Sequence, residues 1–197
     1  MSKPRILSTS VLAKSRLFRI EALEMGFSNG KSATFECLRG EGEGVVMVAA
    51  VNENNQLILV REYAACVDRY ELGFVKGKID PGETPLETAD RELKEEIGYG
   101  ANQLEQLKKV YTSPGYNDFT TYLYCATVLH RESEEGDEAE PLEQVLWPIE
   151  HIAALFQHPE VNDVRVLFLL TMLEKKYMVN AGERGEQMKE VGNDGIA

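Results

Sequence analysis

The first forty residues carry a strand-like pattern of apolar and polar positions. Two β-rich runs, 16–25 and 32–39, flank the segment Ser28-Asn29-Gly30-Lys31. Asn-Gly between two such runs is a strong hairpin signal. Residues 40–44 alternate Gly and Glu and are suited to a flexible joint. The pattern therefore predicts an N-terminal β-hairpin region, 1–43, ahead of a separate domain.

The second region, 44–178, alternates between strand and helix patterns. Its first run, 45–51, is continuously apolar, which is typical of a strand buried on both faces. Further strands are expected at 56–61, 70–75, 105–112, 119–128 and 144–147, and helices at 85–97, 149–157 and 161–176. This order predicts an α/β fold with a mixed sheet between helices. Residues 179–197 have few apolar positions, and we expect a disordered tail.

The helix expected at 85–97 has clear ends and one apolar face. Its apolar residues recur at spacings of three and four, at Leu86, Ala89, Leu93 and Ile97. Thr84 is suited to the N-cap, Pro85 to the first turn and Gly98 to the residue that ends the helix. The remaining face is therefore open to polar residues.

Composition narrows the class of protein. The 197 residues are 43% hydrophobic, enough for a full core, and 33 acidic against 21 basic residues give a net charge of −12. This negative charge repels phosphate backbones and anionic lipids, so we expect no nucleic-acid or membrane partner. The N-terminus has no apolar signal-peptide region, and we expect a soluble, cytoplasmic protein.

The cysteines, Cys37, Cys66 and Cys125, form no C-x-x-C pair and are expected to be free thiols.

Three glutamates share the polar face of the 85–97 helix. Glu95 and Glu96 follow Glu92 by three and four residues, and like charges at this spacing cost about 0.2–0.5 kcal/mol per pair. A hard divalent cation such as Mg²⁺, which takes oxygen ligands and substrate phosphates, offsets such repulsion. The alternative is a solvated glutamate face, which is common on exposed helices.

The segment from Gly77 to Tyr99 matches the Nudix box, G-x5-E-x7-R-E-U-x-E-E-x-G-U, in which U is a bulky apolar residue. Tyr99 is the one departure, because an aliphatic residue is usual there. Seven identities by chance are rarer than about one in a million at average residue usage. The chain resembles the Nudix hydrolases, which cleave a nucleoside diphosphate linked to another moiety. The identities are Gly77, Glu83, Arg91, Glu92, Glu95, Glu96 and Gly98.

This resemblance implies a fold, a cofactor and residue roles. The fold is an α/β/α sandwich, and the cofactor is Mg²⁺, with Mn²⁺ as a substitute. The implied metal ligands are Glu92, Glu95 and Glu96, and Glu95 is also a candidate catalytic proton acceptor. The backbone carbonyl of Lys76 is a further candidate ligand. Supporting roles, which orient the glutamates and the loop, fall to Gly77, Glu83 and Arg91.

Outside the box, the chain resembles the branch that acts on ADP-ribose and other ADP compounds, over about 16–177. The resembling elements are residues 61–63, 70–83, 113–115 and 136–145. A proline about fifteen residues after the box is associated with ADP-ribose hydrolases, and Pro114 stands there, although a Ser-Pro-Gly turn explains it equally well. The implied activity is hydrolysis of ADP-ribose, NADH or diadenosine phosphates to AMP and a phosphorylated moiety.

Substrate contacts are expected from residues near the box. The candidates are Arg61, Glu62, Tyr63 and Glu71: a cation for phosphate, carboxylates for hydroxyl or amino donors and an aromatic ring for adenine. For Arg61 and Glu62 the alternative is a surface charge pair. The acidic loop 132–143 is largely solvated, and the resemblance places a catalytic base or metal ligand in it. For these roles we choose Glu138 as base and Glu140 as ligand.

The same resemblance implies a homodimer built on the N-terminal hairpin, because a hairpin alone is only marginally stable in water. Two rival functions stay open. One is a Nudix hydrolase of nucleoside triphosphates or capped RNA, and the other is a non-catalytic sensor that binds ADP-ribose or NAD. Such sensors typically lose box glutamates, whereas this box is complete.

Overall fold

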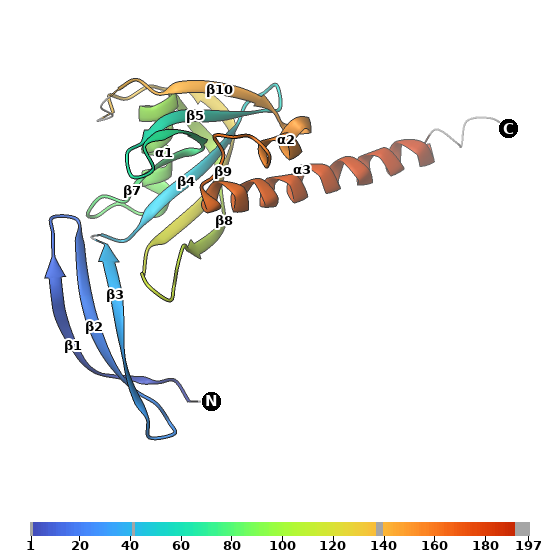
Figure 1. The fold of residues 1–197 in the computed structure, drawn as a ribbon. Helices are drawn as coiled ribbons and strands as arrows, with labels where there is room; N and C mark the ends of the chain where they lie inside the picture. The colour runs from blue at the N-terminus through green and yellow to red at the C-terminus, as the bar shows by residue number, and fades with distance from the viewer. Residues whose placement is uncertain (1, 41, 137–139, 192–197) are drawn as a thin grey trace.

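The computed structural model describes residues 2–40, 42–136 and 140–191, with side chains up to Tyr177. These residues form two β-sheets (Figure 1). The first is antiparallel and contains β1 (Arg5–Lys14), β2 (Phe18–Gly26) and β3 (Ser32–Gly40) in that order. It lies beside one end of the larger sheet (Figure 1). The predicted turn between β2 and β3 is present, since Gly30 and Lys31 both form backbone hydrogen bonds with Phe27.

Strand β1 was not expected from the sequence. Its apolar residues come in adjacent pairs, Ile6-Leu7 and Val11-Leu12, which breaks the alternation that marks a strand. The structure accommodates both pairs through register shifts against β2, between Ile6 and Ser8 and between Val11 and Ala13. The predicted hairpin, β2 and β3, is therefore part of a three-stranded sheet in which β2 is the central strand.

The larger sheet has seven strands, and its main path is β10-β5-β4-β9-β8, with β6 paired to β5 and β7 to β4. Strand β4 pairs in parallel with β9, whereas the other pairs are antiparallel, so the sheet is mixed as predicted. Strand β4 has the predicted bounds, while β8 begins six residues earlier than expected. The bounds are β4 (Val45–Val51), β5 (Gln56–Ala64), β6 (Arg69–Gly73), β7 (Val75–Lys78), β8 (Tyr99–Tyr111), β9 (Thr120–Arg131) and β10 (Glu143–Pro148).

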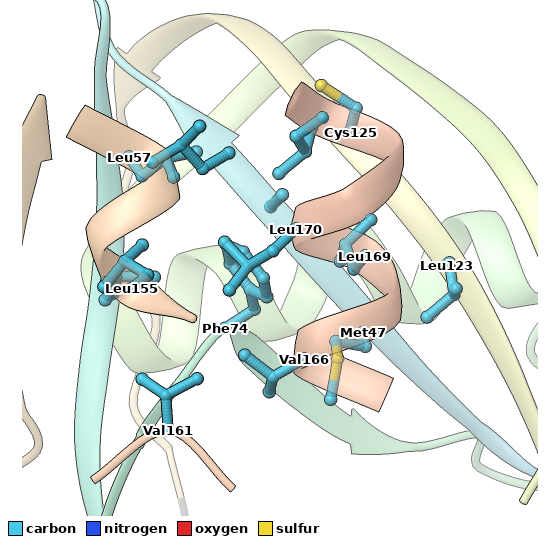
Figure 2. Packing of buried hydrophobic residues seen from close by; sticks show 14 of the residues in the cluster. Met47, Leu57, Phe74, Leu123, Cys125, Leu155, Val161, Val166, Leu169 and Leu170 are labelled. Carbon is cyan, nitrogen blue, oxygen red and sulfur yellow. The ribbon is translucent and has the colours of Figure 1, made fainter. Parts of the chain in front are cut away.

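Helices cover both faces of this sheet. On one face, α1 (Pro85–Ile97) packs on Val46, Val48 and other residues of one cluster. On the other face, α3 (Val164–Val191) and the short α2 (Ile152–Leu155) pack on a cluster that includes Met47. Neighbouring residues of β4 therefore serve opposite cores, which explains its unbroken apolar run. Figure 2 shows this second core, where Phe74, Met47 and Val166 meet. The α/β/α sandwich is confirmed.

Helix α3 follows a one-turn 3-10 helix (Ile149–His151) and α2, and it starts later than predicted. It continues to Val191, past the end of the sheet (Figure 1). Residues 179–191, which we expected to be disordered, thus have helical backbone, in keeping with the helix-favouring Glu, Gln, Met and Lys in this stretch. The rest of the expected tail lies outside the described residues. Across the described chain, none of the helices is long and apolar enough to cross a membrane.

Candidate active site

The loop from β7 to α1 and the helix itself carry the box residues. Thr84 caps α1: its hydroxyl accepts from the Glu87 backbone N–H, and the Glu87 carboxylate accepts from the Thr84 N–H at 2.8 Å. Gly98 ends the helix in the left-handed conformation, at φ 73°. Both ends of α1 are thus fixed by local sequence, as predicted, which sets the direction in which its glutamates project.

Arg91 connects the loop to the glutamate face. Its Nε donates to Glu83 Oε1 at 2.9 Å, and one Nη1 donates to both Glu92 Oε1 and Glu95 Oε2 at 2.8 Å. Its Nη2 donates to the carbonyl of Lys78 at 3.1 Å. The guanidinium therefore joins the end of β7, the loop and two box glutamates, and its supporting role in the site stays a prediction.

These contacts perturb the protonation of the groups involved. Hydrogen bonding from Arg91 lowers the pKa of Glu83 to about 2, and bonds from Thr88 and the Asp80 backbone act in the same direction. The pKa of Arg91 is raised, first by the Glu83 carboxylate and further by Glu92 and Glu95. Glu83 and Arg91 are therefore a charged pair across the whole physiological range.

Gly77 lies directly against the Glu92 carboxylate. A Cβ at this position would come within 1.8 Å of Glu92 Oε1, so only glycine leaves room for the carboxylate. Glu92 and Glu96 are both about 8% exposed, and the backbone N–H of Lys76 donates to Glu96 Oε1 at 3.3 Å. The carboxylates of two box glutamates thus lie against the backbone of β7. This close approach explains why glycine is needed at the first position of the box.

The residues on this face suit a divalent cation. Glu92, Glu95 and Glu96 supply carboxylate oxygens, the donors that Mg²⁺ and Mn²⁺ take, and the Gly77 recess keeps the Glu92 carboxylate at the β7 backbone. In the part of the chain that the structure describes, no three His, Cys, Asp or Glu side chains form a group that could hold a metal ion as they stand. Arg91 pairs with Glu92 and Glu95, at 2.8 Å from each, and its single positive charge offsets part of their negative charge.

The predicted substrate residues lie on β5 and β6, and three of them are engaged in ion pairs. Arg61 pairs with Glu143 at 2.6 Å and Glu160 at 3.0 Å, and the pKa of Arg61 is raised by these carboxylates. Glu62 pairs with the ammonium of Lys76. Arg61 and Glu62 thus have different partners, and their role in binding substrate stays a prediction.

Glu71 and Tyr63 also have specific partners. Glu71 pairs with Arg69 at 2.7 Å and accepts hydrogen bonds from the backbone and side chain of Asn162. Tyr63 donates to Asp68, and its ring lies edge-on to Tyr70, 5.4 Å between centroids. Their role in binding substrate stays a prediction.

The remaining candidates are more dispersed. Pro114 is exposed in the β8–β9 loop, which contacts β3 through a hydrogen bond from the Leu38 N–H to the Tyr116 carbonyl at 2.8 Å. Glu140 accepts from the Tyr70 hydroxyl at 3.1 Å, whereas Glu138 lies outside the described residues. The start of the acidic loop does reach the box, because a Cβ on Gly136 would lie 3.3 Å from Glu95 Cβ.

A cavity of about 420 Å³ brings several of these residues together. Glu62 and Glu71 line it, together with Lys76 and with Asp163 and Arg165 from the start of α3. For the last three, no side-chain role was expected from the sequence. The position of Lys76 next to the box was the available signal for that residue, whereas nothing local pointed to Asp163 or Arg165, which the fold brings from about ninety residues away. A second cavity, of about 780 Å³, shares Asp163 and Arg165 and extends toward Phe18 and Phe119.

Comparison with known proteins places this geometry in a family. The model of the NUDIX domain matches residues 41–170. The chain belongs to the Nudix hydrolases. The model of the NudE-type Nudix hydrolase N-terminal domain matches residues 4–36, which form the N-terminal sheet up to β3. Nudix hydrolases generally use a divalent metal ion, in agreement with the carboxylates on α1.

Individual relatives define the branch. ADP compounds hydrolase NudE of Escherichia coli K12 is 45% identical over 173 residues, 86% of this chain and 92% of that protein. ADP-ribose pyrophosphatase of Bacillus subtilis 168 is 30% identical over 182 residues, 89% of this chain and 97% of that one. A solved structure of an ADP compounds hydrolase matches with a TM-score of 0.83 at 43% identity, over 92% of this chain and 97% of that chain. The expected resemblance is confirmed.

Proposed function

We propose that this Nudix hydrolase cleaves the diphosphate bridge of ADP-linked compounds, such as ADP-ribose, NADH and diadenosine phosphates. The products are AMP and the other phosphorylated moiety, and Mg²⁺ is the cofactor. The observation that carries the proposal is the glutamate face of α1, in which Arg91 and the Gly77 recess hold box carboxylates against β7. The names of the relatives, which act on ADP compounds and ADP-ribose, support the choice of substrate.

The chemistry follows from the charge of the substrate. A diphosphate is anionic and repels nucleophiles, and a bound divalent cation supplies the positive charge that neutralises it and acidifies water. The protein orients the groups around this reaction: Arg91 and Glu83 hold the loop and helix in place, and Glu92 and Glu96 are the proposed metal ligands. Glu95 or Glu138 accepts the proton of the attacking water.

The test is AMP release from a panel of ADP-linked compounds, with and without Mg²⁺. ADP-ribose, NADH and diadenosine phosphates should yield AMP only with the metal present. In ¹⁸O-labelled water, label should enter one of the two phosphate products, which locates the attack. Cleavage of a nucleoside triphosphate to its monophosphate far faster than any ADP compound would overturn the proposed substrate class.

We also propose a homodimer formed through the N-terminal sheet. Every residue of β1 is exposed, and its apolar side chains are more than half exposed, including Leu7 at 58% and Leu12 at 53%. Exposed apolar patches of this kind mark association surfaces. The separate family model for residues 4–36 supports a dedicated role for this region.

A further inference from the structure

Lys76 connects the glutamate face to the 420 Å³ cavity. It lies on β7, where it is paired with Met47 of β4 and directly precedes Gly77. Its backbone N–H donates to Glu96, while its side chain lines the cavity and pairs with Glu62. A single residue thus spans the proposed metal site and the adjoining cavity.

The cavity wall is mostly apolar, and it also carries three acidic and two basic side chains. Its walls include Met47, Leu72 and Phe74 from the core shown in Figure 2. The two cations that line it are Lys76 and Arg165. Such a wall suits the ring of a nucleotide, and Lys76, whose backbone is bonded to Glu96, lies where the cavity is nearest to the glutamate face.

Lys76 and Arg165 differ in how many of their N–H donors are bonded to acidic side chains of the protein. Arg165 is bound by Asp163, whose Oδ1 accepts from both the backbone N–H and Nε of Arg165, at 2.8 and 3.0 Å. The ammonium of Lys76 has three N–H donors, and Glu62 is the hydrogen-bond acceptor found for it. Asp163 lines the same cavity as Lys76 and Arg165. Lys76 therefore carries a partly neutralised charge at the boundary of the cavity.

We propose that the Lys76 ammonium binds a non-bridging oxygen of the substrate diphosphate, beside the metal held by α1, and that Glu62 positions it. The inference rests on the proposed function, because it assigns a contact to the same substrate. Glu62 then acts through Lys76 rather than by touching the substrate. With the ammonium between them, the Glu62 carboxylate and the anionic diphosphate are both bound to the same cation.

The alternative is that Lys76 and Glu62 form an ion pair that only stabilises the fold. Both side chains are about one third exposed, and pairs of that exposure contribute little to stability. The two explanations differ in what they predict for ligands with and without phosphate. A structural pair affects all ligands equally, whereas a phosphate contact affects only ligands that carry phosphate.

The experiment compares Lys76→Met, Lys76→Arg and the wild-type enzyme. Steady-state kinetics on ADP-ribose give KM and kcat, and ADP and adenosine serve as competitive inhibitors that differ only in the diphosphate. For Lys76→Met, we expect KM for ADP-ribose and Ki for ADP to rise about tenfold or more, with Ki for adenosine unchanged within about twofold. Lys76→Arg keeps the charge and should recover most of the affinity for ADP.

Two further variants define the roles. Lys109→Met removes an exposed cation on β8 that lies over the Tyr122 ring, and it should leave all constants unchanged. Glu62→Gln should weaken ADP by a smaller factor than Lys76→Met, and the double variant should be no weaker than Lys76→Met, because Glu62 acts through the lysine. Thermal unfolding verifies that each variant is folded.

The outcomes separate this inference from the proposed function. If wild-type enzyme fails to release AMP from ADP-ribose, the proposed function is wrong. If it does release AMP but Lys76→Met leaves Ki for ADP unchanged, or weakens ADP and adenosine alike, the Lys76 contact is wrong. An additive effect of Glu62→Gln in the double variant would overturn the positioning role of Glu62.

Discussion

Arg91 determines the charge balance of the glutamate face. Its guanidinium donates to Glu83, Glu92 and Glu95, so the repulsion that the sequence pattern implied is offset within the protein by one cation. The Glu96 carboxylate accepts a hydrogen bond from the Lys76 backbone N–H on β7 at 3.3 Å. Glu92 and Glu96 are both nearly buried against β7, so a substitution at either changes the contact between α1 and this strand.

We expect Glu96→Gln to reduce the rate at least about a hundredfold, because it removes one charge that stabilises the transition state. The fold should persist, because like-charge repulsion on α1 falls. Turnover at saturating Mg²⁺ and circular dichroism measure the two effects. An unfolded variant, or one with near-normal turnover, would contradict the assignment of Glu96.

The Glu83–Arg91 pair predicts a pH dependence of stability. The pKa of Glu83 is lowered from 4.5 to about 2, first by Arg91, so the pair stabilises the folded state fully above pH 4.5. This contribution is lost as pH falls from 4.5 toward 2. In Glu83→Gln, urea unfolding should show a lower free energy of unfolding at neutral pH and a shallower fall through that window. Glu150→Gln, at an exposed side chain, is the control and should retain the wild-type profile.

At the scale of elements, α1 is positioned by its caps and by its contact with β7. Both are short-range features: the capping box spans Thr84 and Glu87, and the recess is formed by Gly77 on the neighbouring strand. The capping box should contribute to stability, and the Gly77 recess to the geometry of the site. Substitutions at the two places can separate these contributions.

Thr84→Ala should lower the free energy of unfolding by about 1 kcal/mol, because it removes the side-chain acceptor of the N-cap. Chemical denaturation measures this change. Thr84→Ser keeps the hydroxyl and should be close to wild type. A loss of the same size in both variants would mean that the cap hydrogen bond is not the cause.

Gly77→Ala should abolish most of the activity while the protein remains folded. The new Cβ would meet Glu92 Oε1 at 1.8 Å, and the carboxylate must leave its recess. Gly115→Ala is the matched control, because a Cβ there meets no atom within 4 Å. Rates and melting temperatures of the two variants test the prediction, and a fully active Gly77→Ala enzyme would show that the position of Glu92 is not required.

At the scale of the whole molecule, the N-terminal sheet is set apart from the main core. It connects to the larger unit through the β3 backbone and an ion pair between Arg39 and Asp118 at 3.0 Å. Leu23 is buried and Phe18 lies 6.0 Å from the Phe119 ring, but the large apolar residues of β1 are exposed. Association with a second copy would bury them, in a closed two-fold arrangement.

Light scattering should therefore give a mass of about 44 kDa, twice that of the 22.1 kDa chain. Leu12→Glu places a charge on the exposed face of β1 and should shift the mass toward that of the monomer. Leu86→Glu, which alters an exposed apolar residue of α1, should remain dimeric. A wild-type monomer with full activity would overturn the proposed dimer.

The sequence by itself determined the features that local periodicity and capping encode. The bounds of β4 and α1, the caps at Thr84 and Gly98 and the shared face of the glutamates follow from residues close together in the chain. The box spacing was sufficient to identify the family for the same reason. Strand β1 was not predicted, because its adjacent apolar pairs are compatible with a strand only when the register against β2 shifts at those positions.

Only the tertiary structure decided which charges meet. Arg61 is paired with Glu143 and Glu160, 82 and 99 residues further along the chain, and no local pattern specifies such partners. Lys76 and Glu62 meet because β4 pairs with β7 and β5 pairs with β4, which fixes their strands in one sheet. The cavity and its charges are therefore consequences of sheet topology, since backbone pairing between distant segments, rather than local periodicity, decides which side chains become neighbours.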